Sequence, residues 1–239
     1  MSRVNRFGQP IGDAVLNWRP PAAPTRDTIP GQRCTLEPLD VDHHGDALYD
    51  ANALGDGSNW TYLFAEEPRW REEYLAYMRA EFTGDDPRCY AIIDRVSGRA
   101  VGIASYMRIV PLHGCIEVGH INFSPSLQRT PVATEAMYLM MRHVFDLGYR
   151  RYEWKCDALN APSRAAAQRL GFSYEGVFRN AIVYKGRNRD TAWYSVTDGE
   201  WPALRAAFEQ WLAPENFDAQ GHQRVQLRWL TAALLRAVG

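Results

Sequence analysis

The order of elements expected between Gly114 and Phe172 constrains the fold of this chain most. A buried-looking strand at residues 116–123 leads to Pro125, and a long amphipathic helix, a second strand at 151–156 and a shorter helix at 163–170 follow. The apolar stripe of the long helix consists of Ala133, Ala136, Met137, Met140, Met141, Val144 and Phe145, with Gly148 as the expected C-cap. This alternation of strands and helices indicates an α/β chain.

The flanking sequence extends the pattern into a larger sheet. Turn signals at residues 96–99 and around Pro111 and Gly114 predict an antiparallel meander of strands at 89–94, 100–109 and 116–123. Further strands are expected at 34–39, 172–179 and 191–197, and further helices at 40–53, 68–82, 201–211 and 223–238. The expected fold class is α/β (α+β), with a mixed, mostly antiparallel sheet of about six to seven strands flanked by helices.

Length and charge limit the classes of protein to which the chain can belong. With 239 residues we expect one domain at 33–215, preceded by an extended arm at 1–32 and followed by a helical extension at 216–239. A net charge of -1 and a pI near 6.6 give no overall attraction to nucleic acid or to an anionic membrane. Residues 1–17 lack an apolar signal core, and no apolar run reaches the about 18 residues of a membrane span, so a cytoplasmic protein is expected.

The segment that opens the long helix, Gln128 to Ala136, is a candidate anion site. A helix N-terminus offers free backbone N–H groups and the positive end of the helix dipole. Pro131 suits the first turn of a helix, although it removes one amide. From this segment alone, a phosphate site and a merely well-capped helix are equally good interpretations.

Taken with Asn160, Ser163 and the run Leu170-Gly171-Phe172, the segment resembles the coenzyme A core of the GNAT-type N-acetyltransferases. The resemblance covers roughly residues 33–212 and is closest to the Rim-type group, which acetylates the N-termini of ribosomal proteins. In that family the turn reads Gln or Arg, two residues, Gly, one residue, then Gly or Ala. Here Pro131 takes the glycine position and Arg129 replaces a small residue, so Arg129 is expected to compensate with a charge-assisted contact.

The resemblance implies acetyl-CoA as co-substrate and no metal. It implies coenzyme binding by Gln128, Arg129, Thr130, Val132, Ala133 and Thr134 at the helix. Where two strands of the family splay apart, it implies that the backbone of Ile121, Asn122 and Phe123 contacts the pantetheine arm. Asn160, Ser163 and Arg164 complete the implied coenzyme site, and Asn160 is equally suited to cap the helix that follows it.

Amine acylation needs a group that takes a proton, and two side chains are candidates. Glu117 lies where many relatives carry a carboxylate, and a salt bridge with Arg108 is its alternative role. His120 should face away from Glu117 on a regular strand, so both reach the acceptor only if a bulge intervenes near Gly119. The helix at 163–170 lacks the tyrosine that donates a proton in many relatives, which leaves Asn160 or Ser163 for that role.

The acceptor is expected between the aromatic cluster after the first helix and the late strands. Trp60, Tyr62, Tyr106 and Tyr184 are the expected substrate-binding residues, and Phe64 belongs to the same cluster. The basic loop at 185–190 either attracts an acidic acceptor or is solvated. The implied acceptor is a small-molecule amine or a peptide N-terminus. Residues 1–32 and 216–239 lie outside the resemblance, and a homodimer with contacts through these residues is possible.

Two other functions fit the same motifs. A transferase for another acyl-CoA would have a wider cavity at the thioester, and a coenzyme-binding regulatory module would have lost catalysis. The four cysteines, Cys34, Cys89, Cys115 and Cys156, show no zinc-ligand spacing and are expected to be reduced core thiols.

Overall fold

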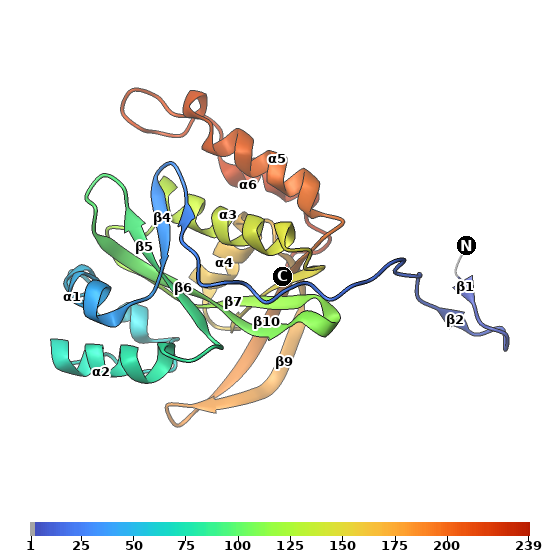
Figure 1. The fold of residues 1–239 in the computed structure, drawn as a ribbon, viewed down its shortest axis with the longest axis horizontal. Coiled ribbons are helices and arrows are strands. Elements are labelled where there is room, and N and C mark those ends of the chain that lie inside the picture. The colour runs from blue at the N-terminus through green and yellow to red at the C-terminus, as the bar shows by residue number, and fades with distance from the viewer. Residues whose placement is uncertain (1–2) are drawn as a thin grey trace.

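The computed structural model describes residues 3–239 and contains one large sheet with helices on both faces (Figure 1). Its eight strands lie in the order β3-β4-β5-β6-β7-β8-β10-β9. Only the central β7–β8 pair is parallel, and the other neighbours are antiparallel. The strands are β3 (Ile29–Pro30), β4 (Cys34–Pro38), β5 (Arg88–Asp94), β6 (Ala100–Val110), β7 (Cys115–Phe123), β8 (Arg151–Asp157), β9 (Ser173–Tyr184) and β10 (Arg187–Thr197). The predicted mixed, mostly antiparallel sheet is confirmed, with one strand more than expected because residues 29–30 of the arm pair with β4.

The helices form two layers with separate apolar cores. The layer of α1 (Val41–Asn52) and α2 (Arg71–Phe82) packs on one face through Leu48, Tyr74 and Met78. The other face is covered by α3 (Pro131–Asp146), α4 (Ala161–Arg169), α5 (Trp201–Leu212) and α6 (Leu227–Thr231). Alternate residues of β5 supply both cores, since Cys89 enters the first and Tyr90 the second. Both faces of the central strands are therefore buried.

The helix α3 begins as its sequence predicts. The Thr130 hydroxyl accepts a hydrogen bond from the N–H of Ala133 at 3.2 Å, and Pro131 occupies the first turn. Glu135 on the same helix is buried, and its carboxylate accepts from the backbone N–H groups of Gln32, Arg33 and Cys34 at 3.1, 2.6 and 2.8 Å. This contact fixes the end of the N-terminal arm to the helix that opens the site.

The rest of the arm runs along the domain and then away from it (Figure 1). The Trp18 indole donates to the carbonyl of Leu112 at 3.3 Å, and the Thr25 carbonyl accepts from the buried Tyr90 hydroxyl at 2.8 Å. On the N-terminal side of Trp18, the strands β1 (Arg3–Val4) and β2 (Pro10–Ile11) pair only with each other. Residues 18–28 of the arm form neither helix nor strand.

The end of the chain differs from the expected helix at 223–238. Only Leu227–Thr231 is α-helical, followed by a 3₁₀ turn at Ala232–Leu234. The Asn216 side chain holds the preceding loop, since its Oδ1 accepts from the N–H of Val225 at 2.8 Å. After the turn the backbone pairs with β9, where the N–H of Tyr174 donates to the Ala237 carbonyl at 3.1 Å. The prediction was wrong because these partners compete with helical hydrogen bonds.

Among residues 3–239, no helix is long and apolar enough to cross a membrane.

Candidate active site

A cavity of about 1640 Å³ opens where β7 and β8 separate. The two strands pair from Cys115 and Arg151 only as far as Val118 and Trp154, although β7 continues to Phe123 and β8 to Asp157. The cavity is lined by the ends of both strands, the start of α3, one side of α4, the β9–β10 hairpin and the segment 221–228. The expected splay is therefore present and opens on a site.

The start of α3 forms one end of the cavity. Gln128, Arg129, Thr130, Ala133 and Thr134 line it, whereas Val132 packs against the core instead. Arg129 has a φ of 61°, a left-handed conformation in which glycine is favoured, and its side chain is exposed. Because Pro131 has no N–H and the Thr130 hydroxyl already bonds that of Ala133, the helix offers few amides to a phosphate.

The backbone of the β7 end is partly occupied. The Phe123 carbonyl accepts from Nδ2 of Asn59 at 2.7 Å and from Nε2 of Gln128 at 2.9 Å. Asn122 is buried and does not line the cavity, whereas Ile121 does. Of the three expected backbone contacts, Ile121 is the one best placed to meet a ligand.

Asn160 acts as the cap of α4 and also lines the cavity. Its Oδ1 accepts from the N–H of Ser163 at 3.1 Å, so its amide nitrogen remains for a second partner. The Ser163 hydroxyl accepts from the Trp154 indole at 3.0 Å and also lines the cavity. The expectation for Arg164 does not fit, because its guanidinium bonds the Tyr194 hydroxyl and the Ala158 carbonyl, both at 3.2 Å, outside the cavity lining.

A bulge brings Glu117 and His120 into the same cavity. The pairing of β6 with β7 shifts between Ser105 opposite Gly119 and Ile103 opposite Asn122, and His120 has a φ of 47°. A Cβ at Gly119 would lie 2.2 Å from the Met107 sulfur, so a larger residue here would require the Met107 side chain to move. The bulge breaks the alternation that would otherwise turn the two side chains to opposite faces.

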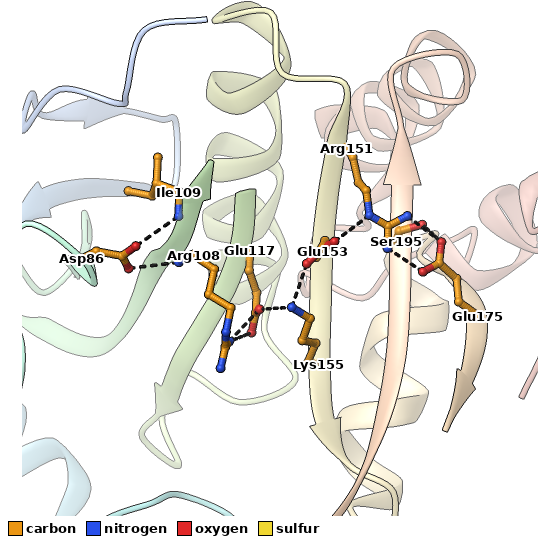
Figure 2. Close-up of polar contacts among 9 residues, drawn as sticks. All are labelled: Asp86, Arg108, Ile109, Glu117, Arg151, Glu153, Lys155, Glu175 and Ser195. Atoms are coloured by element: carbon orange, nitrogen blue, oxygen red, sulfur yellow. Dashed lines mark hydrogen bonds and ion pairs between the residues drawn. The ribbon is translucent and has the colours of Figure 1, made fainter. Parts of the chain in front are cut away.

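Glu117 is held in an ion-pair network rather than left free (Figure 2). Both its oxygens lie 2.7 Å from one Nη of Arg108, and the Lys155 ammonium is 2.7 Å from Oε2. Lys155 also contacts Glu153 at 2.8 Å, and Arg151 joins Glu153 to Glu175. The cross-strand salt bridge with Arg108, which the sequence left open, is thus present and is completed by Lys155, which the sequence analysis missed.

His120 has a different environment. Its ring packs edge-on against Phe82 at 5.2 Å between centroids, and its Nε2 lies 3.8 Å from the Glu81 carboxylate. Burial lowers the pKa of His120 below its usual 6.5, and the charge of Arg108 adds to this, while Glu81 opposes it. The imidazole is therefore neutral at pH 7 and able to accept a proton.

The expected acceptor residues divide into two groups. Tyr62 and Phe64 line the cavity, and the Tyr62 hydroxyl donates to the Leu159 carbonyl at 3.2 Å. Trp60 and Tyr106 do not line it, contrary to expectation. Trp60 packs on Tyr74 and Tyr77 in the first core, and the Tyr106 hydroxyl donates to the Met140 carbonyl deep in the second.

Tyr184 lies behind the cavity wall rather than on it. Its hydroxyl donates to Oδ2 of Asp157 at 2.8 Å, and Asp157 lines the cavity. The sequence analysis missed Trp193, whose ring centre lies 3.9 Å from the Lys155 ammonium. Arg189 of the basic loop, for which solvation was one expectation, is buried instead. These side chains come from the β9–β10 hairpin, which is longer than the expected strands at 172–179 and 191–197.

The cysteines are free thiols in the described chain. Cys156 lines the cavity, but burial raises the pKa of its thiol, which disfavours the nucleophilic thiolate. Burial also raises the pKa of Cys89 to about 12. Away from the cavity, Glu37, His43 and His44 lie together, and both His44 ring nitrogens already have hydrogen-bond partners in Glu37 and the Asp40 N–H.

The splayed strands, the capped helix and the cavity between them place the chain in the GNAT acetyltransferase family, whose domain matches residues 33–173. A crystal structure of a GCN5-related N-acetyltransferase from Brucella melitensis is 47% identical and has a TM-score of 0.89. It is matched over 91% of this chain and 100% of that chain. The chain is also similar to the "Putative ribosomal N-acetyltransferase YdaF" of Bacillus subtilis (strain 168), with 25% identity over 70% of this chain and 90% of that protein.

A crystal structure of RimL, a ribosomal L7/L12 alpha-N-protein acetyltransferase, in complex with coenzyme A shares the fold. Its TM-score is 0.59 at 22% identity, over 72% of this chain and 99% of that chain. The resemblance to the Rim-type group is thereby confirmed at the level of the family and fold.

Proposed function

We propose that the protein is an acetyl-CoA-dependent N-acetyltransferase that acts on a primary amine, either of a small molecule or of a peptide N-terminus. The observation that supports this proposal most is that the start of α3, the open edge of β7 and the neutral His120 all line one cavity. When bound, acetyl-CoA supplies the thioester that the amine attacks directly. The similarity to acetyltransferases named for ribosomal-protein substrates supports a peptide N-terminus as one class of acceptor amine.

The coenzyme phosphates need cationic partners, because the start of α3 offers few amides. Arg129, Arg169 and Arg228 line this end of the cavity, and within residues 3–239 none of them forms an ion pair with a carboxylate. An Nη of Arg169 bonds the Thr134 hydroxyl at 3.2 Å, which holds its guanidinium beside the helix. We assign the phosphates to these three arginines, of which Arg228 comes from the C-terminal segment.

The C-terminal segment is thus part of the proposed site rather than an appendage. Leu227 is buried in the core, and the Thr231 hydroxyl donates to the Arg169 carbonyl at 3.0 Å. The Trp211 indole donates to Gln223 at 2.9 Å, which places that side chain on the cavity wall. This segment lines the cavity together with α3 and α4.

For the proton transfer we assign His120 as the base. Its imidazole is neutral and lines the cavity, whereas the oxygens of Glu117 are already engaged by two cations. We therefore assign Glu117 the role of positioning Lys155 and Arg108. Ser163 is the candidate donor to the leaving thiolate, since its hydroxyl accepts from Trp154 and keeps its own proton to donate.

The test combines calorimetric titration with acetyl-CoA and a thiol-release assay over a panel of amines. We expect binding and thiol release in the wild type, and a turnover about 10²–10⁴-fold lower in His120→Gln with unchanged coenzyme affinity. Propionyl- and butyryl-CoA in the same assay test the acyl preference. Binding without thiol release would instead identify a coenzyme-binding regulatory module, and no binding would refute the assignment.

A further inference from the structure

The side chain of Arg189 carries a charge that is buried beside the cavity without an anionic partner among the described residues. Arg189 is only 7% exposed and lines the cavity from β10. Within residues 3–239 its Nε has no hydrogen-bond partner, and the guanidinium forms no ion pair with a carboxylate. Taking a guanidinium out of water without an anionic partner is costly, so a buried arginine is normally paired.

The neighbours of Arg189 do not replace the missing anion. Its guanidinium carbon lies 5.3 Å from the centre of the Phe64 ring and 5.8 Å from that of Tyr184. Cation–π attraction of this kind is smaller than the desolvation cost of the charge. Asp157 is buried on the adjacent strand but forms no ion pair with Arg189 among the described residues; its Oδ1 accepts from the Leu159 N–H at 2.9 Å and its Oδ2 from Tyr184.

The backbone explains why this arginine points inward. The register of β9 and β10 shifts between Arg189, which pairs with Ile182, and Thr191, which pairs with Phe178. Bulged strands turn side chains to a new direction and are frequent beside active sites. Thr191 is opposite Asp157 on β8, so Arg189 extends just past the end of the strand that forms one side of the splay.

Arg189 lines the cavity beside aromatic side chains and Lys155. Its aromatic neighbour Phe64 comes from the segment after α1, and Trp193 and Lys155 follow on the same wall. The charge of Lys155 is matched by Glu117 and Glu153, whereas that of Arg189 is free. A ligand on this wall thus meets aromatic surface and one unpaired guanidinium.

We propose that Arg189 binds a carboxylate carried by the acceptor, so that the protein acetylates amines that also bear an acidic group. This inference rests on the proposed function and narrows its acceptor class. A guanidinium presents parallel N–H donors that match the two oxygens of a carboxylate, which makes such a pair both strong and directional.

The first test compares acceptors that differ only in this charge. Each amine is supplied as the free acid and as its amide, including serine-led dipeptides with aspartate or asparagine as the second residue. We expect kcat/KM in the wild type to favour the acid by about 10–100-fold, the scale of a charged hydrogen-bonded pair. Arg189→Gln should remove the preference, while Arg179→Gln, an exposed arginine of the same hairpin outside the cavity lining, should keep it.

The second test does not require turnover. Thermal melting is followed in sodium acetate and in sodium chloride at equal ionic strength, without coenzyme. We expect acetate to raise the Tm of the wild type and of Arg179→Gln above the chloride value, and to leave Arg189→Gln unchanged. Equal acetate shifts in all three proteins, or an acid preference that survives Arg189→Gln, would overturn the inference. Absence of thiol release with a normal acetate shift would instead refute the proposed function alone.

Discussion

Replacing Glu117 by glutamine should destabilise the fold as well as affect catalysis. The carboxylate is buried, with its side chain 4% exposed, and contacts Arg108 and Lys155 at 2.7 Å (Figure 2). Removing one partner of a buried ion pair leaves the other charge uncompensated, which costs about 3–5 kcal/mol. Here the cost is reduced because Arg108 is half exposed and Lys155 keeps Glu153 at 2.8 Å.

We therefore expect Glu117→Gln to lower the free energy of unfolding by about 2–4 kcal/mol. For a chain of this size the Tm falls by about 2–4 °C per kcal/mol, which gives a decrease of about 4–16 °C. Urea denaturation and thermal melting measure the two quantities. Glu73→Gln is the matched control, because the pair of Glu73 with Arg69 at 3.4 Å is exposed and worth less than about 1 kcal/mol.

A double variant identifies the origin of the loss. Combining Glu117→Gln with Lys155→Met removes the ammonium that Glu117→Gln leaves without this partner. The double variant should therefore lose less free energy of unfolding than the sum of the losses of the two single variants. If Glu117→Gln melts within a degree or so of the wild type, the ion-pair reasoning is refuted. Glu117 would then be free to act as the base, and any lost turnover would reflect chemistry.

Two further predictions concern binding and pH. Arg129→Ala should weaken acetyl-CoA binding by about 1–3 kcal/mol, as a calorimetric titration would show, because it removes a charged partner of phosphate. An unchanged Kd would mean that Arg129 points to solvent. With the pKa of His120 lowered by burial, kcat/KM should stay high below pH 6.5 and fall only as the pH passes the lowered value. Glu81→Gln removes the charge that favours the imidazolium, so it should move this acidic limb to lower pH, and a shift to higher pH would contradict the assignment.

The fold was largely predictable because local signals agree with tertiary packing. Asp40 caps α1 by accepting from the N–H groups of Asp42 and His43, and aspartate is a residue favoured at this position. Thr130 and Pro131 likewise start α3. The polar residues after Tyr184 indicated a loop, yet they form the start of β10 in a hairpin that is mostly exposed at its far end, where apolar alternation is weak.

The candidate site was less predictable, because it depends on pairing between distant strands. The bulge that places His120 beside Glu117 in the cavity is set by the β6–β7 register, for which Gly119 was the sole local signal. Tyr106 was expected at the acceptor, but an aromatic residue on a strand gives no sign of which face is covered. The burial of Arg189 could not be predicted, since an arginine between polar neighbours in the sequence usually occupies a solvent-exposed position.

The strand order also has a consequence for the newly made chain. β10 lies between β8 and β9, although it is synthesised after both. Until residues 187–197 leave the ribosome, β8 has an open edge and β9 has no partner, because β9 pairs only with β10 among the described strands. A nascent chain that stops at residue 173, the end of the matched family domain, would expose the unpaired edge of β8 to other chains. Completion of the sheet, and with it protection from aggregation, thus waits for the hairpin that carries Arg189.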